Sequence, residues 1–164
     1  AAGDKISLNF NGNSLVGVTV DQGSLNALVE NKQAIYADGG QVILTAKAVD
    51  NLLADVVNNT GEIRAQTIAN QAGRIYLLGE GGAVMVDGKL DASAPNGGNG
   101  GNIETSADHV RFADNVRITT AADRGLSGNW LIDPLNFTVA ASTAPDFGRY
   151  SGLARNCGSS AVAT

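Results

Sequence analysis

The stretch AGRIYLLGEGGAVMVDGKLDAS, residues 72–93, decides the fold of this chain. Ile75 and Leu77 alternate with Arg74 and Tyr76, and such a two-residue period is typical of a half-buried β-strand. A helix of about a dozen residues would be needed between the parallel strands of a βαβ unit, and this stretch has no room for one. It therefore predicts short strands joined by tight, glycine-containing corners.

Strands of the same pattern recur along the chain at a nearly constant spacing. The recurring apolar positions form three series: Val42, Ile75 and Ile103; Ile63, Leu90 and Ile118; and Val84 with Phe112. Successive members share one interval, except that Val42 and Ile75 lie further apart than the rest. Three interleaved series with one period predict a coil of three short strands, each stacked on its counterpart one coil away. We therefore expect an all-β fold, a right-handed parallel β-helix (solenoid) with about 28 residues per coil. A sandwich of hairpins remains an alternative, but it would not explain the shared period.

Two segments depart from the strand pattern. Residues 24–32 (SLNALVENK) and 49–59 (VDNLLADVVNN) carry apolar side chains at i, i+3 and i+4 spacing. This spacing predicts a helix of one or two turns, or a bulged corner, in each segment. Such insertions would explain why the interval from Val42 to Ile75 is longer than the others.

Composition and charge narrow the classes of function. The chain has 164 residues, of which 43% are hydrophobic, so one domain with a substantial core is expected. Its net charge is −5 and its 11 lysines and arginines are scattered, which argues against nucleic-acid binding. No apolar run approaches the roughly 20 residues that span a bilayer. Because the first residues, AAGDKISLNF, contain neither an initiator methionine nor a signal peptide, we expect a piece of a longer protein whose export signal lies elsewhere.

The glycine-rich stretch DASAPNGGNGGNIETSADHV, residues 91–110, raises the question of a ligand site. No Lys follows Gly101 as a phosphate-binding loop requires, and a strand rather than a helix follows the glycines. The run GGNGGN, residues 97–102, comes closer to a calcium-binding repeat, but Asn stands where Asp is needed and the motif does not recur in tandem. A tight turn is the favoured interpretation.

Individual residues with reactive or ligating side chains favour similarly plain interpretations. His109 has no neighbouring His or Cys with ligand spacing, and Cys157, the single cysteine, cannot form an internal disulfide and lies in no nucleophile motif. Both favour a role without chemistry. Asp87, Asp91 and Asp114 lie near comparable corners, and the first and last are one period apart, which would allow these two carboxylates to stack at glycosidase-like separation. Solvated corner residues are the simpler interpretation of all three.

Trp130 is the only tryptophan and precedes several apolar residues and the Asp133–Pro134 dipeptide. A large aromatic side chain is mostly buried, so a core position is favoured over sugar binding by an exposed ring. The sequence accordingly predicts no catalytic, cofactor-binding or metal-ligating residue, and no cofactor.

Four separated phrases in the chain carry a family resemblance. These are NKQAIYADGGQVILTAKA, VVNNTGEIRAQT, LDASAPNGGNGGNIETSA and GNWLIDPLNFTVA. Over residues 3–142 the chain resembles the filamentous-haemagglutinin-like exoproteins of bacterial two-partner secretion, a group that includes contact-dependent inhibition proteins. The resemblance implies a β-helical shaft downstream of the secretion domain, with no catalytic residues. Residues 1–143 are then expected to form the shaft, and residues 144–164, which lack the alternation, an irregular tail.

The resemblance also implies a function and a location. The chain is expected to be part of a secreted or surface-exposed adhesin, in which a structural rod serves cell adhesion or presents a distal binding or toxin module. Its implied partners are an outer-membrane β-barrel transporter and a receptor or glycan on a host or neighbouring cell. Open strand edges at the ends of an excised rod would favour self-association. A carbohydrate-active β-helix enzyme and direct glycan binding remain alternatives: an acidic, aromatic-lined groove would favour the enzyme, and a featureless shaft the rod.

Overall fold

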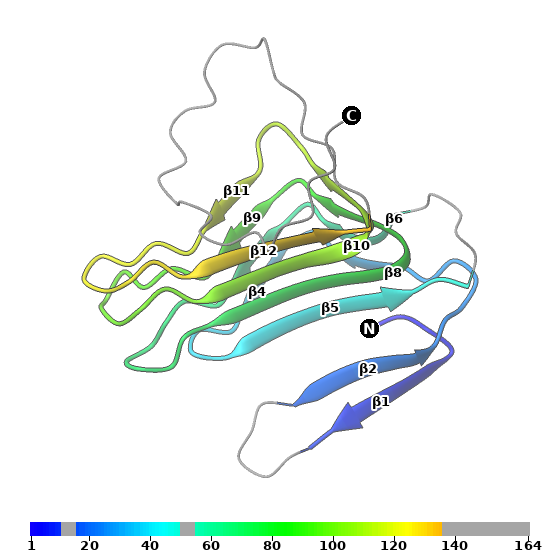
Figure 1. Ribbon diagram of the computed structural model, residues 1–164, viewed down its shortest axis with the longest axis horizontal. Helices are drawn as coiled ribbons and strands as arrows, with labels where there is room; N and C mark the ends of the chain where they lie inside the picture. Colours follow the sequence, from blue (N-terminus) through cyan, green and yellow to red (C-terminus); the bar gives the residue numbers. More distant parts are fainter. Residues whose placement is uncertain (11–15, 50–54, 136–164) are drawn as a thin grey trace, which may run out of the picture.

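The computed structural model describes residues 1–10, 16–49 and 55–135, and within these ranges it contains twelve strands and no helix. Most of the strands stack in parallel as a solenoid of about four turns with a spacing of about 28 residues (Figure 1). The predicted right-handed parallel β-helix is confirmed.

The strands form three faces, which are named here in the order in which the chain visits them. Face 1 consists of β5 (Gln41–Lys47), residues 74–80 of β8 (Arg74–Val86), residues 102–107 of β10 (Asn102–Phe112), and β12 (Asn129–Pro134). Face 2 consists of β3 (Val29–Asn31), β6 (Asp55–Asn59), and the second halves of β8 and β10. Face 3 consists of β4 (Ala34–Tyr36), β7 (Glu62–Arg64), β9 (Lys89–Asp91) and β11 (Arg117–Thr119).

The register confirms two of the three predicted series. On face 1, Val42 pairs with Ile75 and Ile75 with Ile103. On face 3, Ile63 pairs with Leu90 and Leu90 with Ile118.

The third predicted series is wrong. Val84 pairs with Val110, and Phe112 pairs with Val86 instead. The cause is a register shift in β10 between Ala107 and His109. The bend between face 1 and face 2 uses three residues in β8 but only one in β10, so the offset between paired residues of the two strands becomes shorter by two beyond the bend.

The long interval between Val42 and Ile75 has a local origin. The separation in sequence is greater by five for the pair Lys47 and Glu80 than for the pair Asp55 and Ala83. The five extra residues therefore lie between β5 and β6. Residues 50–54, part of the second predicted helix, lie outside the described residues.

The described parts of both predicted helices are extended instead. β3 occupies the end of the first segment and β6 the end of the second. Val29 and Val57 share one inward-facing column with Val84, and each strand bonds to the next coil. Because a strand here gains partners on neighbouring coils, while a helix this short must pay for its own nucleation, the extended form is more stable.

The core consists of columns of side chains that run through the coils. The largest fully buried aliphatic side chains are Ile63, Ile75, Leu77, Leu90, Ile103, Val56, Val57, Val84 and Val86. Each buried Leu, Ile or Val contributes about 1.5–3 kcal/mol. A buried polar step interrupts the columns, where the Asn31 amide donates to Asn59 Oδ1 at 2.7 Å and the Asn59 amide donates to the Gly61 carbonyl at 3.1 Å.

The first end of the solenoid carries an element that is not a coil. β1 (Lys5–Asn9) and β2 (Gly17–Gln22) form an antiparallel hairpin beside the outer edge of β5 (Figure 1). Single bridges join Ala2 to Ala46 and Ser24 to Ala48 on that edge. The predicted shaft thus begins with a hairpin rather than a parallel coil, and its predicted end at residue 143 lies outside the described residues.

Candidate functional site

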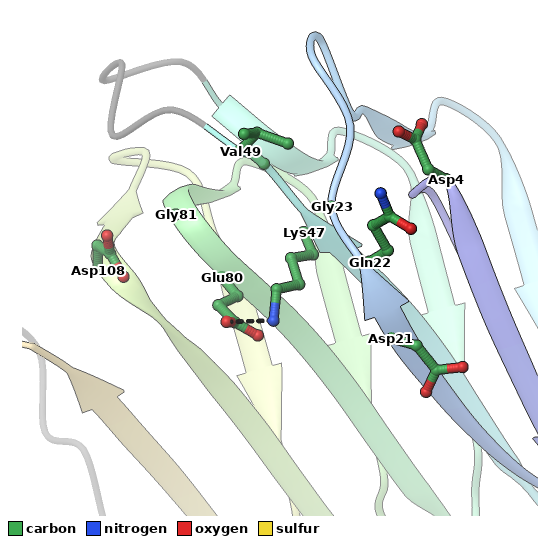
Figure 2. Close-up of a pocket in the computed structure, with 10 residues that line it drawn as sticks. Asp4, Asp21, Gln22, Gly23, Lys47, Val49, Glu80, Gly81 and Asp108 are labelled. Atoms are coloured by element: carbon green, nitrogen blue, oxygen red, sulfur yellow. Dashed lines mark ion pairs between the residues drawn. The ribbon is translucent and has the colours of Figure 1, made fainter.

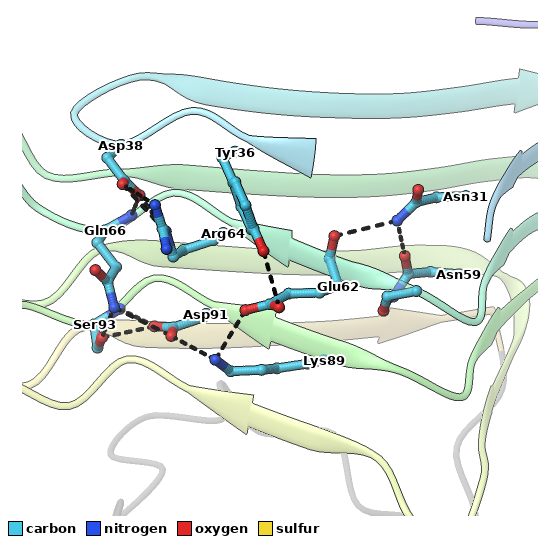
Figure 3. Close-up of polar contacts among 11 residues, drawn as sticks. Asn31, Tyr36, Asp38, Asn59, Glu62, Arg64, Gln66, Lys89, Asp91 and Ser93 are labelled. Atoms are coloured by element: carbon cyan, nitrogen blue, oxygen red, sulfur yellow. Dashed lines mark hydrogen bonds and ion pairs between the residues drawn. The ribbon is translucent and has the colours of Figure 1, made fainter. Parts of the chain in front are cut away.

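The outer surface of face 3 carries a cluster of polar side chains that spans three coils (Figure 3). Each strand of this face has three residues, so the middle residue points inward and its two neighbours point outward. Outward residues of successive coils are separated by about 4.8 Å, within reach of one another's side chains. This polar ladder consists of Tyr36, Asp38, Glu62, Arg64, Gln66, Lys89, Asp91 and Ser93.

Arg64 forms the upper part of the polar ladder. Its Nε and Nη2 atoms donate to the Asp38 carboxylate at 3.1 and 2.8 Å, and its guanidinium lies 4.1 Å from the centre of the Tyr36 ring. This hydrogen bond is the main reason why the pKa of Asp38 is lowered and that of Arg64 is raised. Both groups are therefore held in their charged forms.

Lys89 joins the two lower coils. Its Nζ lies 3.0 Å from Glu62 Oε1 and 3.1 Å from Asp91 Oδ2, and hydrogen bonding to Glu62 is the largest contribution to its raised pKa. Burial alone would raise the pKa of Asp91, but hydrogen bonds from the Ser93 hydroxyl and amide and from Lys89 outweigh it, so the pKa of Asp91 is lowered. The Gln66 amide adds a further hydrogen bond to Asp91 at 3.2 Å.

The chemistry of the polar ladder is that of a brace. Its acids are held ionised and its bases protonated, so none of these groups is poised to exchange a proton near neutral pH. Its donors and acceptors engage one another across coils rather than facing an open cavity. The arrangement ties three successive coils together along the outside of the solenoid.

A second candidate is a concavity of about 600 Å³ near the first end of the molecule (Figure 2). It is lined by Asp4, Asp21, Gln22, Gly23, Lys47, Ala48, Val49, Glu80, Gly81 and Asp108. Lys47 pairs with Glu80 at 2.6 Å, and the remaining three charged groups are all carboxylates. No aromatic side chain is among the lining residues. Within the described ranges, no three His, Cys, Asp or Glu side chains lie close enough together to hold a metal ion.

The glycine-rich loop is a stacked corner. Gly97 and Gly98 adopt φ values of +106° and +86°, which only glycine adopts without strain. The loop is held from the coil below by the Thr67 hydroxyl, which donates to the Asn99 carbonyl at 2.7 Å. From the coil above, the Leu126 amide donates to Asn99 Oδ1 at 3.0 Å. The predicted turn is present, and its polar groups are engaged by neighbouring corners.

The structure separates the acidic corner residues that might have stacked. The Ala113 amide bonds to the Val86 carbonyl and the Arg117 amide to that of Gly88, so the corner of Asp114 contains two more residues than that of Asp87. These two aspartates therefore do not occupy equivalent positions on successive coils. Asp91 is buried within the polar ladder rather than solvated at a corner.

The remaining candidate residues bring no further chemistry together. His109 is exposed at the start of the second half of β10, and Cys157 lies outside the described residues. Trp130 is half-buried in β12, where its indole Nε1 donates to Thr105 Oγ1 at 3.2 Å. Its ring meets the edge of Phe112 with centroids 5.3 Å apart, and it packs against the core as the sequence favours.

Sequence reasoning missed the polar ladder, although a signal was present. Glu62 and Lys89 lie one period apart, and so do Arg64 and Asp91, and each pair has opposite charges. Once the strands of face 3 were aligned, the outward positions on either side of each inward residue could have been compared for charge. The contacts of Asp38 and Gln66 lie beyond the strand ends and could not be found in this way.

Comparison of the chain with protein-family models, with curated proteins and with solved structures finds no match. None of the described residues forms a helix that is long and apolar enough to cross a membrane.

Proposed function

We propose that this chain is a shaft segment of a large secreted or surface-exposed adhesin, a rod that serves cell adhesion or holds a distal binding or toxin module away from the cell. The observation that carries the proposal is the unbroken stacking of coils, with aligned strands on all three faces. Main-chain bonds parallel to the long direction of such a stack resist bending and extension. The resemblance to filamentous-haemagglutinin-like exoproteins supplies the biological setting of this rod.

Two features of the side chains support a mechanical role. Inside, the aliphatic columns pass from coil to coil without a gap in the two middle coils, where Ile63, Ile75 and Leu90 are fully buried. Outside, the polar ladder adds charge-assisted bonds between coils that are separated by 26 or 27 residues in sequence. Both features join each coil to its neighbours rather than shaping a cavity.

The concavity at the first end does not favour the enzymatic alternative. An enzyme acting on polysaccharides needs a groove with aromatic platforms and a pair of carboxylates, one of them held protonated. The concavity has carboxylates but no aromatic lining. It therefore lacks one of the two features by which a carbohydrate-active β-helix would be recognised.

Surface labelling tests the proposal. Antibodies raised against the purified chain should label intact producing cells, or detect the protein in their medium, since a shaft acts outside the cell. Labelling that appears only after the cells are lysed would contradict the proposal. A periplasmic marker probed on the same cells controls for leakage.

The isolated chain also separates the rod from its alternatives. A shaft that only presents a distal module should bind no glycan on an array and release no reducing ends from a panel of polysaccharides. Saturable binding to one glycan class would favour direct binding by this segment. Hydrolysis that Asp87→Asn or Asp91→Asn abolishes would favour an enzyme.

A further inference from the structure

The two ends of the solenoid present matching sets of strand edges. At the first end the outermost strands are β3 on face 2, β4 on face 3 and β5 on face 1. At the last end of the described residues they are the second half of β10 on face 2, β11 on face 3 and β12 on face 1. In both sets the chain visits the faces in the same order, so one end can continue the winding of the other without a change of register.

The inward columns would continue across such a junction. The column on face 2 contains Val29, Val57, Val84 and Val110, one valine from each coil. The column on face 3 contains Ile35, Ile63, Leu90 and Ile118. If a second copy followed the last coil, its Val29 would meet Val110 and its Ile35 would meet Ile118. Aliphatic contacts of the same kind as those inside the solenoid would form in both columns.

An outward column of face 2 adds charge complementarity. It runs from Glu30 through Asn58 and Met85 to Arg111. Continuation would place Glu30 of the second copy one strand spacing from Arg111, with the opposite charge. Both side chains are accessible, with 33% and 48% of their surface exposed.

The N-terminal segment occupies one third of this junction. The Ala2 amide donates to the Thr45 carbonyl at 2.9 Å and the Lys47 amide to the Ala2 carbonyl at 3.1 Å, on the edge of β5 that β12 of another copy would use. Ser24 makes two similar bonds, to Lys47 and Val49. These four bonds are the backbone contacts of residues 1–24 with that edge among the described residues.

The segment is a light attachment. Its hairpin has large apolar side chains with much of their surface exposed, including 55% for Leu8 and 72% for Phe10. An isolated two-stranded hairpin is marginally stable in water. Removing it from the edge of β5 would therefore cost less than opening any junction between coils.

We propose that a second copy of this chain stacks head to tail on the first, with β12 pairing with β5 of the second copy, and that residues 1–24 form a displaceable cap that opposes this stacking. The interface is heterologous, so it propagates into filaments rather than closing into a dimer. This inference goes beyond the role of a shaft, because it holds whatever module the rod presents.

A disulfide between the two ends tests the junction in the full chain. Glu30→Cys and Arg111→Cys are combined with Cys157→Ser, so that only the junction cysteines remain. Within one copy, two strands separate the two positions, which places them about 14 Å apart, and a disulfide spans no more than about 7 Å between Cα atoms. Covalent multimers therefore report contact between copies. Each single-cysteine variant, which can form dimers at most, is the matched control.

The cap is opened by Gly23→Val, because a Cβ at Gly23 would lie 2.9 Å from the Lys47 carbonyl oxygen. A second opening variant, Ala2→Pro, removes the amide that bonds to Thr45. With either variant we expect a ladder of multimers on mild oxidation, at a protein concentration at least tenfold lower than with the intact cap. Trp130 fluorescence should shift to the blue as β12 becomes covered. Circular dichroism confirms that the variants keep their strand content.

Other results would overturn the proposal. If folded, uncapped variants yield only monomers, the last end is covered by something other than a second copy, such as residues 136–164 of the same chain. If only the single-cysteine variants cross-link, the copies associate side by side. Either outcome leaves the surface-labelling test of the shaft unaffected, so the two proposals fail separately.

Discussion

The coil formed by β8 and β9 and the hairpin formed by β1 and β2 show how differently the same alternating pattern can be stabilised. The coil has a parallel neighbour on each side, and Ile75, Leu77 and Leu90 have no exposed surface. The hairpin pairs only with itself, and Ile6 and Leu8 retain 41% and 55% exposure. Alternation alone therefore makes a strand, but stacking between two coils makes it a stable one. Four experiments can break or sharpen this contrast.

The largest effect is expected from a charge inside a middle column. Ile103→Asp buries a carboxylate at a position with 2% exposure, between Ile75 and Trp130, and should lower the free energy of unfolding by roughly 4 kcal/mol. Ile118→Asp, at a half-buried position in the outer strand β11, should cost less, and Ile6→Asp in the hairpin least of all. Urea denaturation followed by circular dichroism measures all three. Equal losses for Ile103→Asp and Ile6→Asp would refute the contrast.

The next effect concerns the close contact between corners. A Cβ at Gly73 would lie 1.6 Å from the Ala65 carbonyl oxygen, so Gly73→Ala must push two coils apart and should cost about 2–3 kcal/mol. Gly17→Ala in the hairpin is the matched control, because its Cβ would make an ordinary contact of 3.6 Å with Asn9. The same denaturation measurement applies. A mild Gly73→Ala would mean that the corners are less tightly stacked than the structure shows.

A third test compares two neighbouring asparagines in β6. Asn59 is fully buried and accepts a hydrogen bond from Asn31, so Asn59→Ala leaves that donor unsatisfied and should cost about 1–2 kcal/mol. Asn58 Oδ1 is buried without a hydrogen-bond partner among the described residues, and Asn58→Ala should cost much less. Thermal melts of the two variants provide the comparison. A reversed order would show that the Asn31–Asn59 step does not join the coils.

The smallest effect should come from the outside of the solenoid, through acid. The pKa of Asp38 is lowered below 3.8 by its bonds with Arg64, so the contribution of this pair is complete above the unfolded-state pKa and is lost as the pH falls through the lower native value. Asp38→Asn should therefore lower stability at pH 7 slightly, and the difference from the native chain should vanish near pH 2. Stability measured from pH 7 to pH 2 on both proteins tests this. A difference that persists in acid would assign the effect to packing instead of charge.

Much of the architecture follows from local pattern. Val42, Ile75 and Ile103 share an alternating environment and belong to one recurring series, and both properties survive in the structure as a column on face 1. The pattern works because side chains of a strand alternate strictly between two sides, so inward positions can be read without knowing the partner strand. The glycine-rich corner is readable for a similar reason, since its backbone needs positive φ at Gly97 and Gly98.

The failures lie where partners are chosen. Val84 and Phe112 match in spacing, yet the bend after Gly79 holds more residues in β8 than in β10 and shifts the pairing by two. The hairpin alternates like any coil strand, and nothing local in Lys5–Asn9 indicates that it pairs in the antiparallel sense. The polar ladder depends on the same choice, because the partner of Arg64 lies one coil away at Asp38.

By itself, then, the sequence determined that the chain forms short strands, which side of each strand faces inward, and that the strands wind with a common period. Only the tertiary structure decided which residues stack, which end is capped and which outward charges meet. The physical reason is that alternation is a property of one strand, whereas register is set by the summed lengths of all the corners in a coil. A difference of two residues in one bend leaves every local preference satisfied and still changes the neighbour of every residue beyond it, as it does for Phe112.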